Sequence, residues 1–227
     1  MRLGTINDLR FDERKLPRMI DRCAALALPK DAKLPPEWPL PELVIPAGEL
    51  ATWRARQHLP AGRPLVALAP GAVGPSKRWP ASYYGEVAKH LSRSGAIVVV
   101  IGSPTESPLA AEIGDGDPDI RDLTGADLRN AILALGSAAV AISNDSGLLH
   151  VAAALGTPTI GIFGPTSPWH WAPLNPLAAV VQAEIELDCR PCHKPVCRLG
   201  HHRCMQEIPA ARVIEITRTA LATARAS

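Results

Sequence analysis

The feature that most constrains the fold is a regular alternation of short apolar runs and helical segments that starts near residue 64. Apolar runs of this length are typical of buried strands, and the segments between them place apolar residues at helical spacing. The expected strands lie at 64–70, 96–103, 120–125, 138–145, 158–164 and 178–184. Strands that are apolar throughout are covered on both faces, as in parallel sheets with crossover helices. The sequence therefore predicts an α/β fold with a doubly wound, Rossmann-like parallel sheet over residues 61–227.

Helices are expected between these strands and after the last one, over 81–95, 105–114, 127–137, 146–156 and 211–226. Asp127 is a suitable N-cap, and Gly95 and Gly156 are suitable C-terminal stops. Before residue 61 the chain is charged and interrupted by prolines, with short helices expected over 16–28 and 48–59. We interpret the proline-rich segment 34–46 as a linker or as an arm that lies on another surface.

Composition limits the class of protein. The 227 residues suffice for one large domain with an extension. The 24 Lys and Arg residues nearly balance the 22 Asp and Glu residues, which argues against a nucleic-acid-binding protein. No apolar run reaches the ~18 residues of a membrane-spanning helix, and the first residues contain no apolar signal core. The sequence therefore predicts a cytoplasmic protein without a nucleic-acid partner.

Residues 143–147, Ser-Asn-Asp-Ser-Gly, interrupt an apolar stretch where the fourth strand passes into a helix. Their Asn, Asp and Ser are all good N-cap residues, and the first turn of a helix attracts anions. Gly147 allows a ligand to approach the backbone. His150 follows Ser146 by one turn, and its side chain is expected to lean back towards the helix N-terminus. We interpret this turn as a site for a phosphate group.

For two residues of this region the sequence leaves two roles open. Asp145 would repel a diphosphate, so we expect it to cap the helix or to accept hydrogen bonds from sugar hydroxyls. His150 is either part of the site or a core histidine whose ring is hydrogen-bonded within the protein.

Two more loops follow expected strands and carry charged residues. The loop 70–80 contains Lys77 and Arg78, which are well placed for a diphosphate, although its spacing differs from that of a Walker loop. Its alternative is a solvated basic turn. Glu106 follows the second strand, where an acidic residue commonly accepts a hydrogen bond from a ribose hydroxyl. Its alternative is an ordinary acid in the first turn of a helix.

Four of the five cysteines cluster with three histidines in one polar stretch. The cysteines are Cys189, Cys192, Cys197 and Cys204. The histidines are His193, His201 and His202. Four thiolates, or three and a histidine, could close a structural zinc site, although the last spacing is wider than that of a usual zinc knuckle. A loop of free thiols is the favoured alternative.

Three segments together resemble the bacterial lipopolysaccharide heptosyltransferases, in particular the heptosyltransferase II branch. They are PGA and KRWP within 70–80, NDSGLLHVAAALGTPTIGIFGPTSP at 144–168, and the cysteine-rich segment at 189–205. LGTINDLR at 3–10 is similar to a segment in mid-chain of that family. The resemblance implies a GT-B glycosyltransferase with two facing Rossmann-like domains. Residues 61–227 would be its C-terminal, donor-binding half, and residues 1–60 the remnant of an N-terminal domain and a linker.

The resemblance also implies an activity, which is the inverting transfer of heptose from ADP-heptose to the inner core of lipopolysaccharide. The reaction would take place at the cytoplasmic face of the inner membrane, with peripheral association at most and without a divalent metal. Lys77 matches the diphosphate-binding lysine of the family. The donor-binding turn is matched by Asp145, Ser146 and Gly147, and the histidine after it by His150. Glu106 matches an acidic residue at the nucleoside.

The catalytic aspartate of the family lies near the start of its acceptor domain, and no motif assigns that role to Asp8 or Asp12. Because inversion needs a base at the acceptor hydroxyl, we expect a C-terminal part that binds donor but does not transfer heptose alone. Two other hypotheses are a catalytically inert nucleotide-sugar-binding module and a metal-stabilised interaction domain built on the cysteines.

Overall fold

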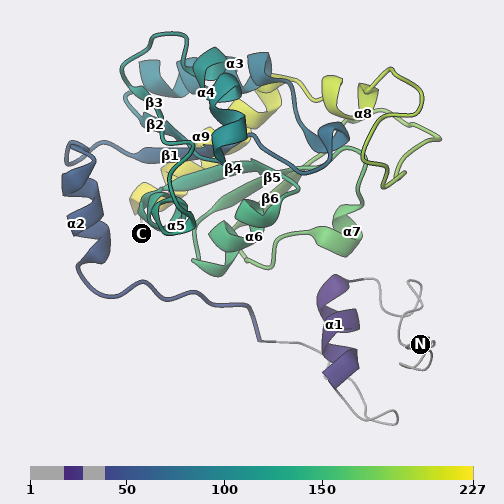
Figure 1. Ribbon diagram of the computed structural model, residues 1–227, viewed down its shortest axis with the longest axis horizontal. Helices are drawn as coiled ribbons and strands as arrows, with labels where there is room; N and C mark the ends of the chain where they lie inside the picture. Colours follow the sequence, from purple (N-terminus) through teal and green to yellow (C-terminus); the bar gives the residue numbers. More distant parts are fainter. Residues whose placement is uncertain (1–17, 28–38, 227) are drawn as a thin grey trace.

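The computed structural model describes residues 18–27 and 39–226, and its centre is a six-stranded sheet (Figure 1). The strands are β1 (Leu65–Ala69), β2 (Ile97–Val100), β3 (Ile120–Asp122), β4 (Val140–Asn144), β5 (Thr159–Ile162) and β6 (Ala178–Val181). Their order is β3-β2-β1-β4-β5-β6, and every neighbouring pair is parallel. Each strand lies within an expected segment. The predicted doubly wound, Rossmann-like sheet is therefore confirmed.

Helices cover both faces of the sheet. One face carries α3 (Ala81–Arg93), α4 (Ser107–Gly114) and α9 (Ala210–Ala226), and the other carries α2 (Glu49–Arg56), α5 (Leu128–Ser137) and α6 (Gly147–Ala154). Because side chains alternate along a strand, β1 serves both cores. Val66 and Leu68 pack towards α3, whereas Leu65 and Ala67 pack on the side of α5.

The shorter elements lie in loops. They are α1 (Met19–Ala27), α7 (Pro168–Trp171), α8 (Arg203–Gln206) and the 3-10 helices η2 (Pro75–Lys77) and η3 (Pro104–Glu106). Two local predictions hold. The Asp127 side chain caps α5 by accepting a hydrogen bond from Asn130 N over 2.7 Å. Gly95 follows α3 with a φ of 88°, a conformation that favours glycine.

The segment before β1 contacts the sheet domain through α2. Trp53 is buried in the same core as Leu65, and its Nε1 donates to Asn130 Oδ1 over 2.7 Å. Glu49 and Arg129 form an ion pair between α2 and α5. The division of the chain at residue 60 remains a prediction, and residues 3–10, Asp8 and Asp12 lie outside the described residues.

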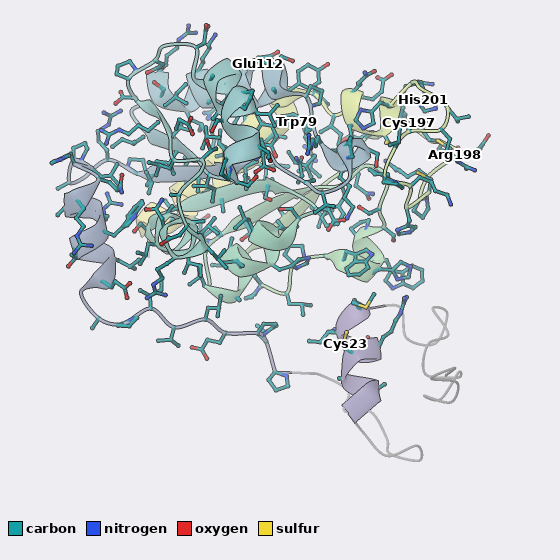
Figure 2. All side chains as sticks on the ribbon, viewed as in Figure 1. Cys23, Trp79, Glu112, Cys197, Arg198 and His201 are labelled. Atoms are coloured by element: carbon teal, nitrogen blue, oxygen red, sulfur yellow. The ribbon has the colours of Figure 1, made fainter. Side chains whose placement is uncertain are left out.

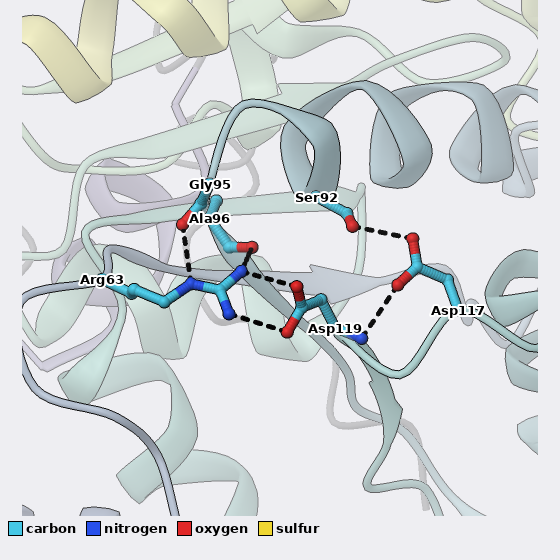
Figure 3. A network of polar contacts seen from close by, with 6 residues as sticks. All are labelled: Arg63, Ser92, Gly95, Ala96, Asp117 and Asp119. Atoms are coloured by element: carbon cyan, nitrogen blue, oxygen red, sulfur yellow. Dashed lines mark hydrogen bonds and ion pairs between the residues drawn. The ribbon is translucent and has the colours of Figure 1, made fainter.

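A polar network fixes the amino ends of three strands (Figure 3). Arg63 donates to the backbone oxygens of Gly95 and Ala96 over 2.9 Å and to the Asp119 carboxylate over 2.7 and 2.8 Å. These hydrogen bonds hold the pKa of Asp119 below its usual range. Asp117 in turn accepts from Ser92 Oγ and Asp119 N. The network stabilises the edge of the sheet opposite the predicted site, whose residues lie in loops at the carboxyl edge.

No helix among the described residues is both long and apolar enough to cross a membrane.

Candidate functional site

The predicted site lies where the strand order reverses, between the carboxyl ends of β1 and β4. Asn144, fully buried at the end of β4, holds the loop 70–80 in place. Its Nδ2 donates to Pro70 O over 2.6 Å, and its Oδ1 accepts from Trp79 N and Tyr84 Oη over 3.2 Å each. Asn144 is thus a link between two loops, and the N-cap position of α6 is taken by Ser146.

Lys77 and Asp145 form an ion pair across the two loops. Lys77 Nζ lies 2.7 Å from Asp145 Oδ2, and the side chains are 33% and 6% exposed. A carboxylate so well buried needs a partner, and here the lysine supplies it. The expectation that Asp145 caps the following helix is wrong, because its carboxylate holds Lys77 instead. The Lys77 side chain stays partly exposed to solvent.

The N-terminus of α6 is open. Ser146 occupies the N-cap position, and within the described structure its side chain makes no capping hydrogen bond. Its hydroxyl lies 3.1 Å from Ser143 Oγ instead. Apart from its chain neighbours and the backbone of α6, no described atom lies within 4 Å of where a Cβ at Gly147 would stand. Ser146, Gly147 and Lys77 line one cavity, so the positive end of the α6 dipole lies at the same cavity as the lysine, as an anion site requires.

A groove made of two adjoining cavities crosses this helix end. The first, of about 630 Å³, has an apolar wall that includes Ile101, Leu128 and Val151. The second, of about 460 Å³, is lined by Lys77, Asp145, His150, Trp171 and the loop at 193–195. Residues common to both linings are Val73, Ser146 and Gly147. The groove thus joins a mainly apolar compartment to a charged one at the N-terminus of α6.

Glu106 lies in the lining of the first cavity. Its Oε2 accepts from Ser103 N over 2.6 Å and from Ser103 Oγ over 2.8 Å, which makes a capping box at η3. The carboxylate lies against Gly71 and Gly102, where a Cβ would overlap it. No described residue donates to Oε1. Glu106 is therefore a capping acid through Oε2, while Oε1 has no donor among the described residues.

His150 lies in the wall of the second cavity and of a smaller one of about 260 Å³ next to Trp171. Burial lowers the pKa of His150, the Lys77 ammonium lowers it further, and the Asp145 carboxylate opposes both effects. A ring that is neutral at pH 7 can both donate and accept a hydrogen bond. Its position in the cavity wall favours the site interpretation over that of a core histidine.

The cysteine-rich segment 189–205 closes one side of the second cavity, and it contacts Ser76. Ser76 N donates to Pro195 O over 3.0 Å, and Ser76 Oγ donates to Lys194 O over 2.5 Å. The Ser76 carbonyl oxygen lies 2.6 Å from His202 Nε2. The sequence indicates no role for Ser76, because its partners Lys194 and His202 lie 118 and 126 positions away.

The geometry of this segment gives the structural zinc hypothesis no support. Cys189, Cys192, Cys197 and Cys204 are free thiols, and among the described residues no three His, Cys, Asp or Glu side chains are placed to hold a metal ion. Backbone N–H groups, that of His202 first, hydrogen-bond to Cys197 and lower its pKa. Burial, together with the three other thiols, raises the pKa of Cys204 to about 11.

Residues 3–202 match the family model of glycosyltransferase family 9, the heptosyltransferases. The chain belongs to this family. The matched range includes both loops of the groove and most of the cysteine-rich segment. The predicted resemblance to the heptosyltransferases is confirmed.

Several family 9 proteins are similar to this chain. Lipopolysaccharide heptosyltransferase 2 of Salmonella typhimurium is 34% identical over 230 residues, which cover 95% of this chain and 65% of that protein. Lipooligosaccharide heptosyltransferase 2 of Haemophilus influenzae is 32% identical over 92% of this chain and 64% of its own length. The chain therefore spans about 65% of the length of the curated relatives it matches.

Solved family 9 structures share the fold. The structure of Escherichia coli ADP-heptose lipopolysaccharide heptosyltransferase II aligns with a TM-score of 0.78 at 32% identity, over 91% of this chain and 62% of that one. A family 9 glycosyltransferase from Veillonella parvula aligns with a TM-score of 0.67 at 24% identity, over 77% and 50% of the two chains. The second comparison supports the fold alone.

Proposed function

We propose that this family 9 chain binds ADP-heptose and forms the donor-binding part of a GT-B heptosyltransferase that extends the inner core of lipopolysaccharide. The observation that carries the proposal is the placement of Lys77 beside the open N-terminus of α6 within one groove. The choice of ADP-heptose is supported by the similarity to the E. coli ADP-heptose enzyme.

The two cavities suit the parts of such a donor. The adenosine would occupy the first cavity, whose wall is mostly apolar and whose acceptor, Glu106, suits a ribose hydroxyl. The diphosphate would lie across Ser146 and Gly147, which line both cavities. The heptose would then extend into the second cavity, towards His150.

The proposed chemistry of this part concerns the leaving group. When the bond between the sugar and the diphosphate breaks, negative charge builds up on the departing phosphate. Lys77 and the first-turn N–H groups of α6 would stabilise this charge, and Asp145 keeps the lysine in place. We assign no residue of this chain as the base for the acceptor hydroxyl. Since the proposed acceptor is lipid-linked, we propose that the protein works at the cytoplasmic face of the inner membrane.

Calorimetry with ADP tests the proposal. Lys77→Ala removes a charge-assisted hydrogen bond, so we expect affinity to fall by about 1.5–3 kcal/mol, roughly 10- to 150-fold. The matched control is Lys89→Ala, because Lys89 forms an ion pair of the same length, 2.7 Å, with Asp115 outside the groove. The control should bind like the wild type. Wild-type protein that does not bind ADP, or equal affinity in Lys77→Ala, would refute the proposal.

A further inference from the structure

The tip of the cysteine-rich segment exposes apolar side chains at one end of the molecule. Val196 is 63% exposed and Leu199 is 62% exposed. Figure 2 shows the neighbouring Cys197, Arg198 and His201 on the loop that projects beyond α8. Two exposed apolar residues so close together on a projecting loop are a candidate contact surface.

Cationic residues flank these apolar residues along the chain. Four cations and no carboxylate lie between residues 189 and 206, and they are Arg190, Lys194, Arg198 and Arg203. The carboxylates that flank the segment, Asp188 and Glu207, stand at its two ends, and Glu207 pairs with Arg203 over 3.1 Å. The tip therefore presents an apolar pair next to the exposed cations Lys194 and Arg198, and no carboxylate of the described residues forms an ion pair with either cation.

An exposed tryptophan extends this surface. Trp169 on α7 is 69% exposed and stacks on His170, with ring centroids 6.3 Å apart. His170 in turn lies 6.3 Å from the ring of His193, at the start of the tip. Tryptophan is enriched where a protein meets the boundary between lipid and water. The rings of Trp169, His170 and His193 thus form a row from α7 to the tip.

Hydrogen bonds join the base of the loop to two other loops. Pro165 O accepts from Cys192 N and His193 N over 3.0 Å each. Ser76 binds Lys194 and Pro195 through their carbonyl oxygens. Because Ser76 precedes Lys77, whatever the tip contacts lies next to the charged end of the groove.

We propose that the tip formed by residues 193–200, together with Trp169, docks on the surface of an anionic phospholipid bilayer. Val196 and Leu199 would enter the headgroup region while Lys194 and Arg198 bind lipid phosphates. The complementarity of charge favours this occupant over a neutral surface, which would leave the cations without partners. Docking would hold the groove beside the membrane. The inference does not depend on the identity of the nucleotide sugar.

Co-sedimentation with vesicles tests the docking surface. The 227-residue chain is mixed with vesicles of phosphatidylcholine alone or with phosphatidylglycerol added, at two salt concentrations. We expect binding only with phosphatidylglycerol and weaker binding at high salt. Val196→Ser with Leu199→Ser should lower the partition coefficient by ~10-fold or more, and Arg198→Gln by about fivefold. Thermal unfolding checks that each variant is folded.

The matched control is Val44→Ser with Leu177→Ser, which removes two exposed apolar residues from another part of the surface. It should sediment like the wild type. Equal binding to neutral vesicles, no binding to either kind, or equal loss in the control would overturn the proposal. Sedimentation velocity adds a further criterion, because a dimer that the tip variants dissociate would assign the surface to a second copy of the chain.

Discussion

Asn144 donates a hydrogen bond from its side-chain amide to the Pro70 carbonyl oxygen over 2.6 Å, joining two positions 74 residues apart at the mouth of the groove. The same buried side chain accepts hydrogen bonds from Trp79 N and Tyr84 Oη. The loop that carries Lys77 is therefore held at both of its ends by one residue of β4.

We expect Asn144→Ala to lower the free energy of unfolding by ~2–4 kcal/mol, because it leaves several buried polar groups without a partner. Urea denaturation measures the change. Tyr84→Phe removes only one of these hydrogen bonds and should cost ~0.5–1.5 kcal/mol. If Asn144→Ala unfolded at the same urea concentration as the wild type, the linking role would be wrong.

Gly71→Ala should displace the Glu106 carboxylate, because a Cβ at position 71 would overlap Oε1. The side chain can turn away, so we expect little loss of stability but ~10-fold weaker binding of ADP. Inorganic pyrophosphate should bind as before, since Lys77 and α6 are unchanged. Glu106→Gln, which changes the same carboxylate directly, is the comparison variant for ADP binding.

The effects of Gly71→Ala and Glu106→Gln on the affinity for ADP should not be additive. If Gly71→Ala acts through Glu106, the double variant binds ADP no more weakly than the more affected single variant. Fully additive losses in calorimetry would show that Gly71 acts on the nucleotide by another route.

Protein stability should decrease on acidification because of His150. Burial lowers its pKa in the folded state, so from about pH 6.5 downwards the unfolded state binds more protons than the folded one. The free energy of unfolding is thus retained above pH 7 and falls as the pH drops towards the folded-state pKa. Urea titrations from pH 5 to 8 should show a flatter dependence for His150→Gln.

Asp145→Asn provides the opposite test of His150. It removes the carboxylate that raises the pKa of His150 and leaves the Lys77 ammonium, which lowers it. The dependence on pH should therefore become steeper in Asp145→Asn. An unchanged slope in both variants would mean that His150 does not control stability in this range.

The thiols of the cysteine-rich segment should react at different rates. Backbone hydrogen bonds lower the pKa of Cys197, whereas burial and the neighbouring thiols raise that of Cys204 to about 11. Since the thiolate is the nucleophile, iodoacetamide at pH 7.5 should modify Cys197 well before Cys204, as followed by peptide mass spectrometry. Stoichiometric zinc in the purified protein, with all four cysteines protected, would contradict the finding that these cysteines are free thiols in the described structure.

Much of the fold could be predicted because its signals are local. The apolar runs and the helical spacing between them depend on neighbours within a few residues, as do the Asp127 cap and the Gly95 stop. That the candidate site residues lie at one edge of the sheet could be predicted for the same reason. Lys77, Ser146 and Gly147 follow expected strands, and a parallel sheet brings the ends of its strands to one edge.

The roles of Asn144 and Asp145 could not be predicted in this way. Each is a good N-cap residue by local preference, yet Asn144 bonds to Trp79 and Asp145 pairs with Lys77, 65 and 68 positions away. The cysteine spacing likewise left zinc and free thiols open, because the direction of each thiol depends on the path of the loop.

By itself, the sequence determined the class of fold, the order of its elements and the edge of the sheet that carries the charged loops, since hydrophobic burial and turn chemistry are encoded in short windows. Only the tertiary structure decided which polar groups became partners, because a buried donor or carboxylate binds whichever group the folded chain brings within reach. It also decided that Lys194 and Pro195 close the groove through Ser76, over contacts that no local pattern specifies.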